Sequence, residues 1–130
     1  MTIVVAYDGS LAGRRALEHA ADLAGPSACM VIVNVVPAQS VSARLQTITE
    51  DERARQRRLL RDAARVLRRR GLQGRVVEAA GDPAAEILSA AESVDAQLLV
   101  IGTGGPRHLL HRSLARRIVR RAPCDVLVVR

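Results

Sequence analysis

The chain has 130 residues, of which 48% are apolar and 25% charged, and its formal net charge is +7. This length suffices for one hydrophobic core without disulfides or metals, so we predict a single domain over residues 1–130. Tyr7 is the only aromatic residue, which argues against nucleic-acid modules that read bases by aromatic stacking. Every cationic side chain apart from histidine is arginine, and the positive balance favours an anionic partner without identifying it.

Targeting and membrane signals do not emerge from the sequence. No stretch approaches the roughly 18 consecutive apolar residues of a membrane span, and the chain starts with an apolar strand pattern in place of a leader. We therefore expect a cytoplasmic protein with no membrane partner. Cys29 and Cys124 fit neither a metal spacing nor a redox pair, and we expect both to be small buried residues in a reducing compartment.

Hydrophobic patterning predicts five strands that alternate with four helices. Short apolar runs predict strands over Thr2–Tyr7, Met30–Val36, Arg75–Ala80, Gln97–Ile101 and Asp125–Val129. Helical spacing predicts helices over Leu11–Ala24, Glu50–Arg70, Pro83–Ala91 and Ser113–Arg121. Ser10 and Asp82 are expected to cap the first and third helices, and Gly71 to end the second. Such an alternation is typical of an α/β domain, a doubly wound parallel sheet with helices on both faces.

The longer loop between predicted elements runs from Pro37 to Thr49. It shows no hydrophobic period and is long for a connector inside a compact domain. A lid or binding loop and a simple linker are equally supported interpretations.

The second loop of interest follows the fourth strand, from Gly102 to Arg112. Its glycines permit positive φ and close approach of a ligand to the backbone. A helix that begins at Ser113 would add unpaired N–H groups and the positive end of its dipole. No acidic residue occurs between Gly102 and Cys124. The loop therefore indicates a site for a phosphate-bearing ligand, with a plain turn as the competing interpretation.

The fold class predicts where such a ligand would lie. In open parallel sheets, ligands bind at the carboxyl ends of the strands, where the strand order reverses. Asp8 follows the first strand and Gly102 ends the fourth. If these strands are neighbours, both residues face one crevice.

Five segments resemble the universal stress protein family in the right order along the chain. They are Val-Val-Ala-Tyr-Asp-Gly-Ser, Val-Ile-Val-Asn-Val-Val, Gly-Asp-Pro-Ala-Ala-Glu-Ile-Leu, Leu-Val-Ile-Gly-Thr-Gly-Gly and the ending Ala-Pro-Cys-Asp-Val-Leu-Val-Val-Arg. The resemblance implies a Rossmann-like, adenine-nucleotide alpha-hydrolase-like sheet in strand order 3-2-1-4-5 and a homodimer. In that order the strands that carry the two cysteines lie about 14 Å apart, too far for a disulfide.

The resemblance also implies a ligand and its residues. In nucleotide-binding members, an aspartate after the first strand and a valine at the end of the second hold the nucleoside, and Asp8 and Val35 match them. The phosphates are held by a loop written as Gly, two residues, Gly, nine residues, then Gly followed by Ser or Thr. Gly102, Gly105 and Ser113 match parts of that loop. The implied ligand is ATP or a related adenine nucleotide, with Mg²⁺ as its accompanying ion.

The loop departs from the family pattern in two places. Only six residues separate Gly105 from the position of the third glycine, and that position holds Arg112. Arg112 either supplies a charge-assisted contact to phosphate, together with Arg107, or fills the pocket. The first outcome predicts a nucleotide-binding regulatory or stress-protective protein. The alternative is a family member that does not bind ATP and acts as a dimeric protein-interaction scaffold.

Catalytic and metal sites are not expected. Asp8 has no nucleophile or second carboxylate spaced to act with it, so the protein is not expected to be an enzyme beyond slow incidental ATP hydrolysis. His108 and His111 lack a carboxylate or cysteine partner that would complete a metal site.

Two predicted surfaces, an arginine-rich helix and the final strand, bear on which macromolecules the protein binds. The stretch from Glu50 to Arg70 holds nine arginines and four acids, which we interpret as a solvated helix face because acids are interspersed and no aromatic accompanies them. Nucleic acid is therefore not an expected partner. Val126–Val129 would form an apolar sheet edge, which predicts self-pairing into a symmetric homodimer. We expect an unidentified protein partner to recognise a nucleotide-induced change in the loop from Pro37 to Thr49 and in the glycine loop.

Overall fold

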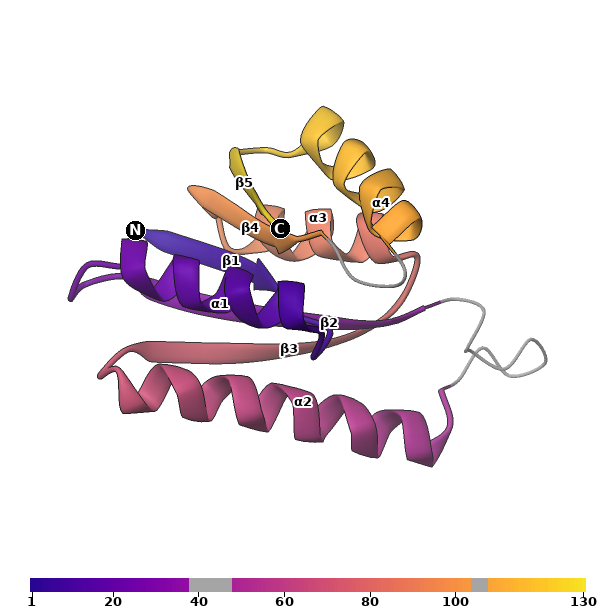
Figure 1. Cartoon of the computed structure of the whole chain (residues 1–130), viewed down its shortest axis with the longest axis horizontal. Helices are drawn as coiled ribbons and strands as arrows, with labels where there is room; N and C mark the ends of the chain where they lie inside the picture. Colours follow the sequence, from indigo (N-terminus) through magenta and orange to yellow (C-terminus); the bar gives the residue numbers. More distant parts are fainter. Residues whose placement is uncertain (38–47, 104–107) are drawn as a thin grey trace.

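The computed structural model describes residues 1–37, 48–103 and 108–130, with side chains from residue 113 onward in the last range. It contains a five-stranded sheet in the order β3-β2-β1-β4-β5 (Figure 1). The strands are β1 (Thr2–Ala6), β2 (Cys29–Pro37), β3 (Gln73–Gly81), β4 (Leu98–Gly102) and β5 (Asp125–Val129). All four neighbouring pairs are parallel, so the predicted fold class and strand order are confirmed.

Strand order reverses between β1 and β4. On one side β1 pairs with β2, with Val4 opposite Val31, and on the other side it pairs with β4, with Val4 opposite Leu99. The carboxyl ends of β1 and β4 consequently lie side by side. This is the position at which ligands bind in sheets of this kind.

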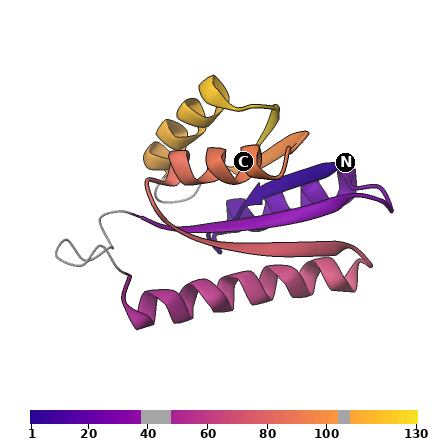
Figure 2. The same ribbon diagram turned by 180° about the vertical axis from the view of Figure 1, so that it is seen from behind.

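Helices cover both faces of the sheet. They are α1 (Leu11–Leu23), α2 (Glu50–Arg69), α3 (Pro83–Ser93) and α4 (His108–Arg121). α1 and α2 lie on one face, and α3 and α4 on the other, which Figure 2 shows from behind. The caps predicted from sequence are confirmed: Ser10 and Asp82 accept hydrogen bonds from the first turns of α1 and α3, and Gly71 follows α2 with φ +70°.

Each face of the sheet has its own hydrophobic core, because consecutive strand residues point to opposite faces. Fully buried members on the α1 and α2 side include Ile3, Leu17, Met30, Leu60 and Leu67. Those on the α3 and α4 side include Val4, Val31, Leu99 and Ile118. The small branched side chains allow the helices to lie close to the sheet.

Two expectations from the sequence are wrong. α4 begins at His108, five residues before the predicted start at Ser113. Leu109 and Leu110 extend its apolar pattern toward the N-terminus, so its first turn already lies inside the stretch expected to be loop. Cys29 is exposed, while Cys124 is partly buried; both are free thiols, and burial, followed by the charge of Asp125, raises the pKa of Cys124.

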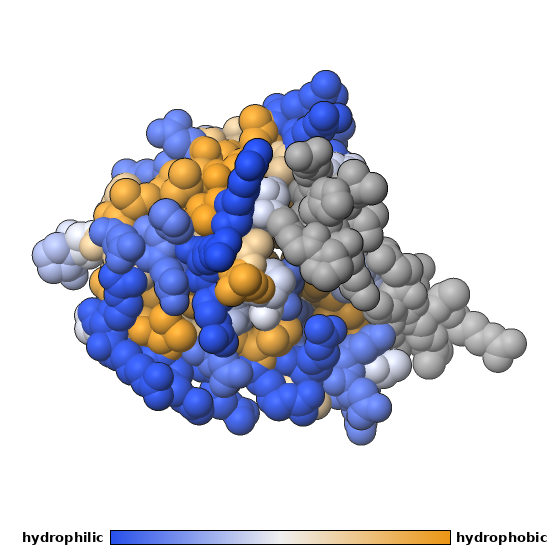
Figure 3. Space-filling model, in the orientation of Figure 1, coloured by the Kyte–Doolittle hydropathy of each residue, from blue (hydrophilic) through white to orange (hydrophobic). Residues whose placement is uncertain are grey.

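Within the described residues, β5 forms one edge of the sheet and pairs only with β4. Val128 on this strand and Val119 on α4 are 42% and 55% exposed. Figure 3 shows apolar side chains gathered where β5 lies in Figure 1. The edge predicted to be apolar is therefore present and uncovered.

Candidate functional site

The turn after β1 positions Asp8 at the start of α1. Oδ1 of Asp8 accepts a hydrogen bond from the backbone N–H of Ser10 at 2.9 Å, and Oγ of Ser10 accepts one from Gly13 N–H at 3.0 Å. Gly9 has φ +81°, a conformation that glycine adopts readily. The Asp8 carboxylate is exposed and held at the positive end of the helix dipole.

Gly102 lies against the first turn of α1. A Cβ atom at Gly102 would be 2.4 Å from the carbonyl oxygen of Ala12 and 2.9 Å from the backbone nitrogen of Gly13. A Cβ atom at Gly13 would in turn be 2.8 Å from Oδ1 of Asp8. The structure thus brings Asp8 and Gly102 together on either side of one helical turn.

This contact gives Gly102 a packing role in addition to the predicted ligand-binding one. Positive φ occurs at three described glycines, Gly9, Gly71 and Gly81, and Gly102 is not one of them. The backbone of α1 occupies the space that the missing side chain leaves. Gly102 is therefore required by helix-on-sheet packing of the chain itself, before any ligand is considered.

The other predicted site residues are distributed unevenly. Val35 lies near the end of β2, partly buried on the face that α3 and α4 cover. Ser113 is exposed in the second turn of α4, so it does not cap that helix. Gly105 and residues 38–47 lie outside the described residues, and Arg112 is described only as part of the α4 backbone.

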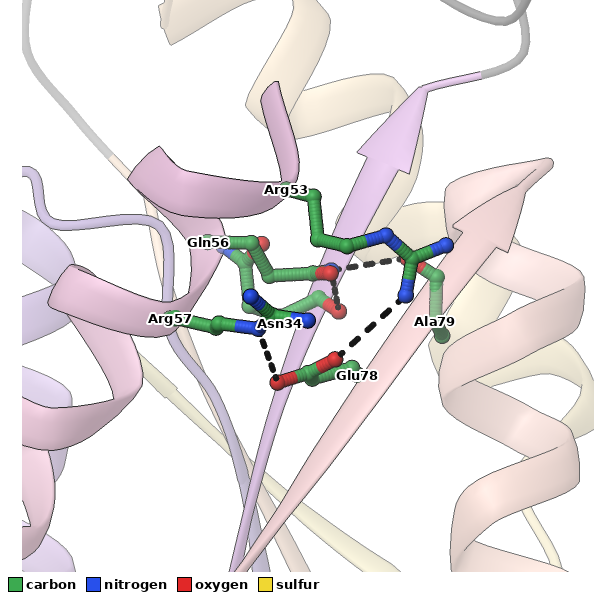
Figure 4. Close-up of polar contacts among 6 residues, drawn as sticks. All are labelled: Asn34, Arg53, Gln56, Arg57, Glu78 and Ala79. Carbon is green, nitrogen blue, oxygen red and sulfur yellow. Dashed lines mark hydrogen bonds and ion pairs between the residues drawn. The ribbon is translucent and has the colours of Figure 1, made fainter. Parts of the chain in front are cut away.

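Sequence analysis missed a buried polar cluster at the same end of the sheet (Figure 4). Gln56 on α2 is 2% exposed. Its Nε2 donates to the carbonyl oxygens of Asn34 at 2.9 Å and Ala79 at 2.8 Å, while Asn34 Nδ2 donates to the Tyr7 carbonyl at 2.8 Å. The two Gln56 bonds tie α2 to β2 and β3, and the Asn34 bond ties β2 to the end of β1. The available signal was a glutamine four residues before Leu60 on the inner stripe of α2.

Two groups of ion pairs fix neighbouring helices. Glu78 on β3 lies 3.9 Å from Arg53 and 3.8 Å from Arg57 on α2. Asp82, the cap of α3, accepts two hydrogen bonds from Arg117 on α4, at 3.1 and 2.7 Å. The bond from Arg117, and after it the Ala85 N–H, lowers the pKa of Asp82. Because Asp82 follows β3, this pair fastens α4 to the α3 side of the carboxyl edge.

Two open concavities lie on the outer side of α4. One, of about 400 Å³, is lined by Ala115, Arg116, Val119 and Arg120. The other, of about 330 Å³, is lined by Thr103, Ala115, Arg116, Val128 and Arg130. The second includes Val128 of β5, and neither includes Asp8 or Val35.

The described residues show neither a metal-binding cluster nor a membrane-spanning helix. They contain no group of three or more His, Cys, Asp or Glu side chains placed to hold a metal ion. None of their helices is long and apolar enough to cross a membrane.

Comparison with known proteins identifies the family. The sequence profile of the Universal stress protein family matches residues 1–130. A universal stress protein of Mycobacterium tuberculosis is 32% identical over 139 aligned residues, which cover 98% of this chain and 94% of that protein.

Two solved structures share the fold at somewhat lower identity. The universal stress protein of Archaeoglobus fulgidus in complex with dAMP is 25% identical, with a TM-score of 0.81 over 100% of this chain and 98% of that one. A universal stress protein in complex with cAMP is 26% identical, with a TM-score of 0.75 over 100% and 96% of the two chains. Family match, relatives and fold agree, and the chain belongs to the universal stress protein family.

Proposed function

We propose that this protein binds an adenine nucleotide at the carboxyl edge between β1 and β4 and acts as a regulatory or stress-protective protein without catalytic turnover. The observation that carries the proposal is the juxtaposition of Asp8, the first turn of α1 and the end of β4 at the reversal of strand order. Relatives with the same fold bind dAMP and cAMP. The protein is expected to work in the cytoplasm.

Each predicted residue has a chemical task in this proposal. The Asp8 carboxylate accepts hydrogen bonds from ribose hydroxyls, and Val35 provides apolar contact for the nucleoside. Phosphates lie toward the loop residues Gly102, Gly105, Arg112 and Ser113, with Mg²⁺ accompanying a triphosphate. Arg112 replaces the backbone amides of the intact family loop with a charge-assisted contact.

The decisive experiment is calorimetric titration of nucleotide-free protein with Mg-ATP and with AMP, beside an Arg112→Gly variant. Binding by the wild type that weakens in the variant supports a phosphate contact by Arg112. Binding gained only by the variant means that the arginine blocks the pocket, and the scaffold function then stands in its place. No measurable binding of either nucleotide by either protein would reject nucleotide binding at this site.

Catalysis is tested in the same samples. The proposal predicts ATP turnover no faster than in buffer, because no nucleophile or second carboxylate is spaced in the sequence to act with Asp8. A turnover rate that rises in proportion to protein and falls in an Asp8→Asn variant would contradict it.

We further propose that the protein is a homodimer through Val126–Val129, the edge of β5. Exposed Val128 and the uncovered backbone edge support pairing with a second copy. Light scattering of the wild type should give a molecular mass of twice the chain mass. The Val128→Asp variant should give the mass of a single chain. Leu23→Asp, a matched change at an exposed apolar residue of α1, should leave the dimer intact. A monomeric wild type would contradict the proposal. An unidentified protein partner would recognise the change that nucleotide binding causes in the loops beside the site.

A further inference from the structure

α2 carries more arginines than any other helix that the structure describes. From Arg53 to Arg70 the chain holds nine arginines and a single acid, Asp62. Six of these arginines, all exposed, form what we call the basic face: Arg55, Arg58, Arg61, Arg65, Arg68 and Arg69. The face extends about 21 Å along the helix, at 1.5 Å per residue.

The basic face points away from the molecule. On the opposite side of α2, Gln56, Leu60, Ala63 and Leu67 are buried against the sheet, so the arginines between them face solvent. Figure 3 shows hydrophilic side chains projecting along the lower edge, where α2 lies in Figure 1.

The four acidic residues of α2 do not neutralise the basic face. Three of the four, Glu50, Asp51 and Glu52, lie in the first turn of α2, where Glu52 closes a capping box with Thr49. Asp62 lies 3.8 Å from Arg65. Glu78 pairs with Arg53 and Arg57, outside the face. Within the described part of the chain, no ion pair involves the remaining five arginines. Three of the four acids of α2 thus lie at its start, and the fourth is paired with one arginine of the basic face.

The other face of the sheet is mixed in charge. α3 carries Glu86 and Glu92 and no basic residue, whereas α4 beside it carries Arg116, Arg117, Arg120 and Arg121 and no acid. Of these arginines, Arg117 is paired with Asp82. A polyanion would therefore be attracted to both α2 and α4, and because the two helices lie on opposite faces of the sheet, substitutions on each helix separate their contributions.

We propose that the basic face binds the phosphate backbone of double-stranded nucleic acid without sequence preference. A protein partner would require an apolar interface centre, yet the large exposed apolar side chains of the described residues lie on other elements. A membrane-bound helix inserts an apolar face, and the apolar face of α2 is already buried. Single strands would require aromatic stacking, and the only aromatic ring, Tyr7, is buried. Binding to the phosphate backbone of a duplex needs neither apolar nor aromatic contacts, because the release of counterions drives it.

The experiment is fluorescence anisotropy of a short labelled DNA duplex of mixed sequence, titrated with the full-length protein over a range of NaCl concentrations. The variant replaces Arg58, Arg61 and Arg65 with glutamine, and the control replaces Arg116, Arg120 and Arg121 on α4. Both change the net charge from +7 to +4, by loss of three arginines. Glutamine keeps helix propensity, and circular dichroism checks that both proteins fold.

The variant should lose about a hundredfold in affinity at 0.1 M salt, and the slope of log K against log salt should fall by about 2.7, the value for three phosphate contacts. The control should change little. Equal losses in variant and control would overturn the proposal, because net charge alone would then explain binding. Tighter binding to the single strand, or equal binding to polyglutamate, would overturn the assignment to a duplex. The test is independent of the nucleotide proposal, because Arg112→Gly should leave duplex binding unchanged.

Discussion

The carboxyl edge of the sheet is held together differently at its two ends. Around β1, β2 and β3, side-chain hydrogen bonds do the fastening: Ser10 caps α1, Asn34 binds the Tyr7 carbonyl, and Gln56 binds two strand carbonyls. Around β4 and α4, close backbone contact at Gly102 and an ion pair at Arg117 replace them. The first end depends on side-chain hydrogen bonds to the backbone, and the second on an ion pair and on a side chain that is absent.

This difference explains why a glycine at the end of a strand has two interpretations. A missing side chain at the end of a strand is equally compatible with ligand approach and with an approaching helix. At Gly102 the helix is there, 2.4 Å from where a Cβ would be. The predictions below test each end in turn.

The largest effect is expected from Gly102→Ala. Its Cβ would overlap the carbonyl of Ala12, and because backbone cannot rotate away as a side chain can, we expect a loss of about 3 kcal/mol in the free energy of unfolding. Urea denaturation measures it. The control is Gly25→Ala, where a Cβ would meet nothing within 4 Å and stability should be unchanged or slightly higher. A neutral Gly102→Ala would return the residue to a purely ligand-related role.

Gln56→Leu should have the next largest effect. The change leaves the carbonyls of Asn34 and Ala79 without this donor in a buried environment, at a cost of about 1–3 kcal/mol. Gln56→Glu should be worse at neutral pH, because it places a charge where the side chain is 2% exposed. Amide hydrogen exchange at the ends of β2 and β3 should accelerate in both variants. Unchanged protection there would contradict the conclusion that the Gln56 hydrogen bonds hold α2 to these strands.

A pair of serine substitutions separates the two helix starts. Ser10→Ala removes an observed N-cap and should destabilise the fold by about 1 kcal/mol. Ser113→Ala lies in an exposed position inside α4 and should change stability by less than about 0.5 kcal/mol. Equal losses would mean that α4 begins at Ser113 after all.

The smallest effect concerns the ion pair that fastens α4. Arg117 lowers the pKa of Asp82, so the folded state favours the ionised carboxyl. The resulting stability is present above the ordinary carboxyl pKa of about 4 and is lost as pH falls through the lowered folded-state value. Asp82→Asn keeps a good cap but lacks the charge. Its stability deficit at pH 7 should therefore shrink below about pH 4, and a deficit independent of pH would assign Asp82 to capping alone.

Local chemistry in the sequence determined the strands, the helix caps and the fold class. Continuous apolar runs of β-branched residues specify buried strands, and Ser10, Asp82 and Gly71 act on neighbours within a few residues. The family pattern added the strand order. These features depend on short-range interactions or on hydrophobic periodicity, both of which can be read along the chain.

Tertiary structure decided what long-range contacts determine. The reason for a glycine at Gly102 lies in α1, and the partners of Gln56 lie on β2 and β3, far along the chain. The start of α4 at His108 also escaped prediction, because glycine and proline before it resemble a longer loop. Whether acids and arginines of α2 neutralise one another depended on the side of the helix each occupies, a consequence of helical geometry and capping.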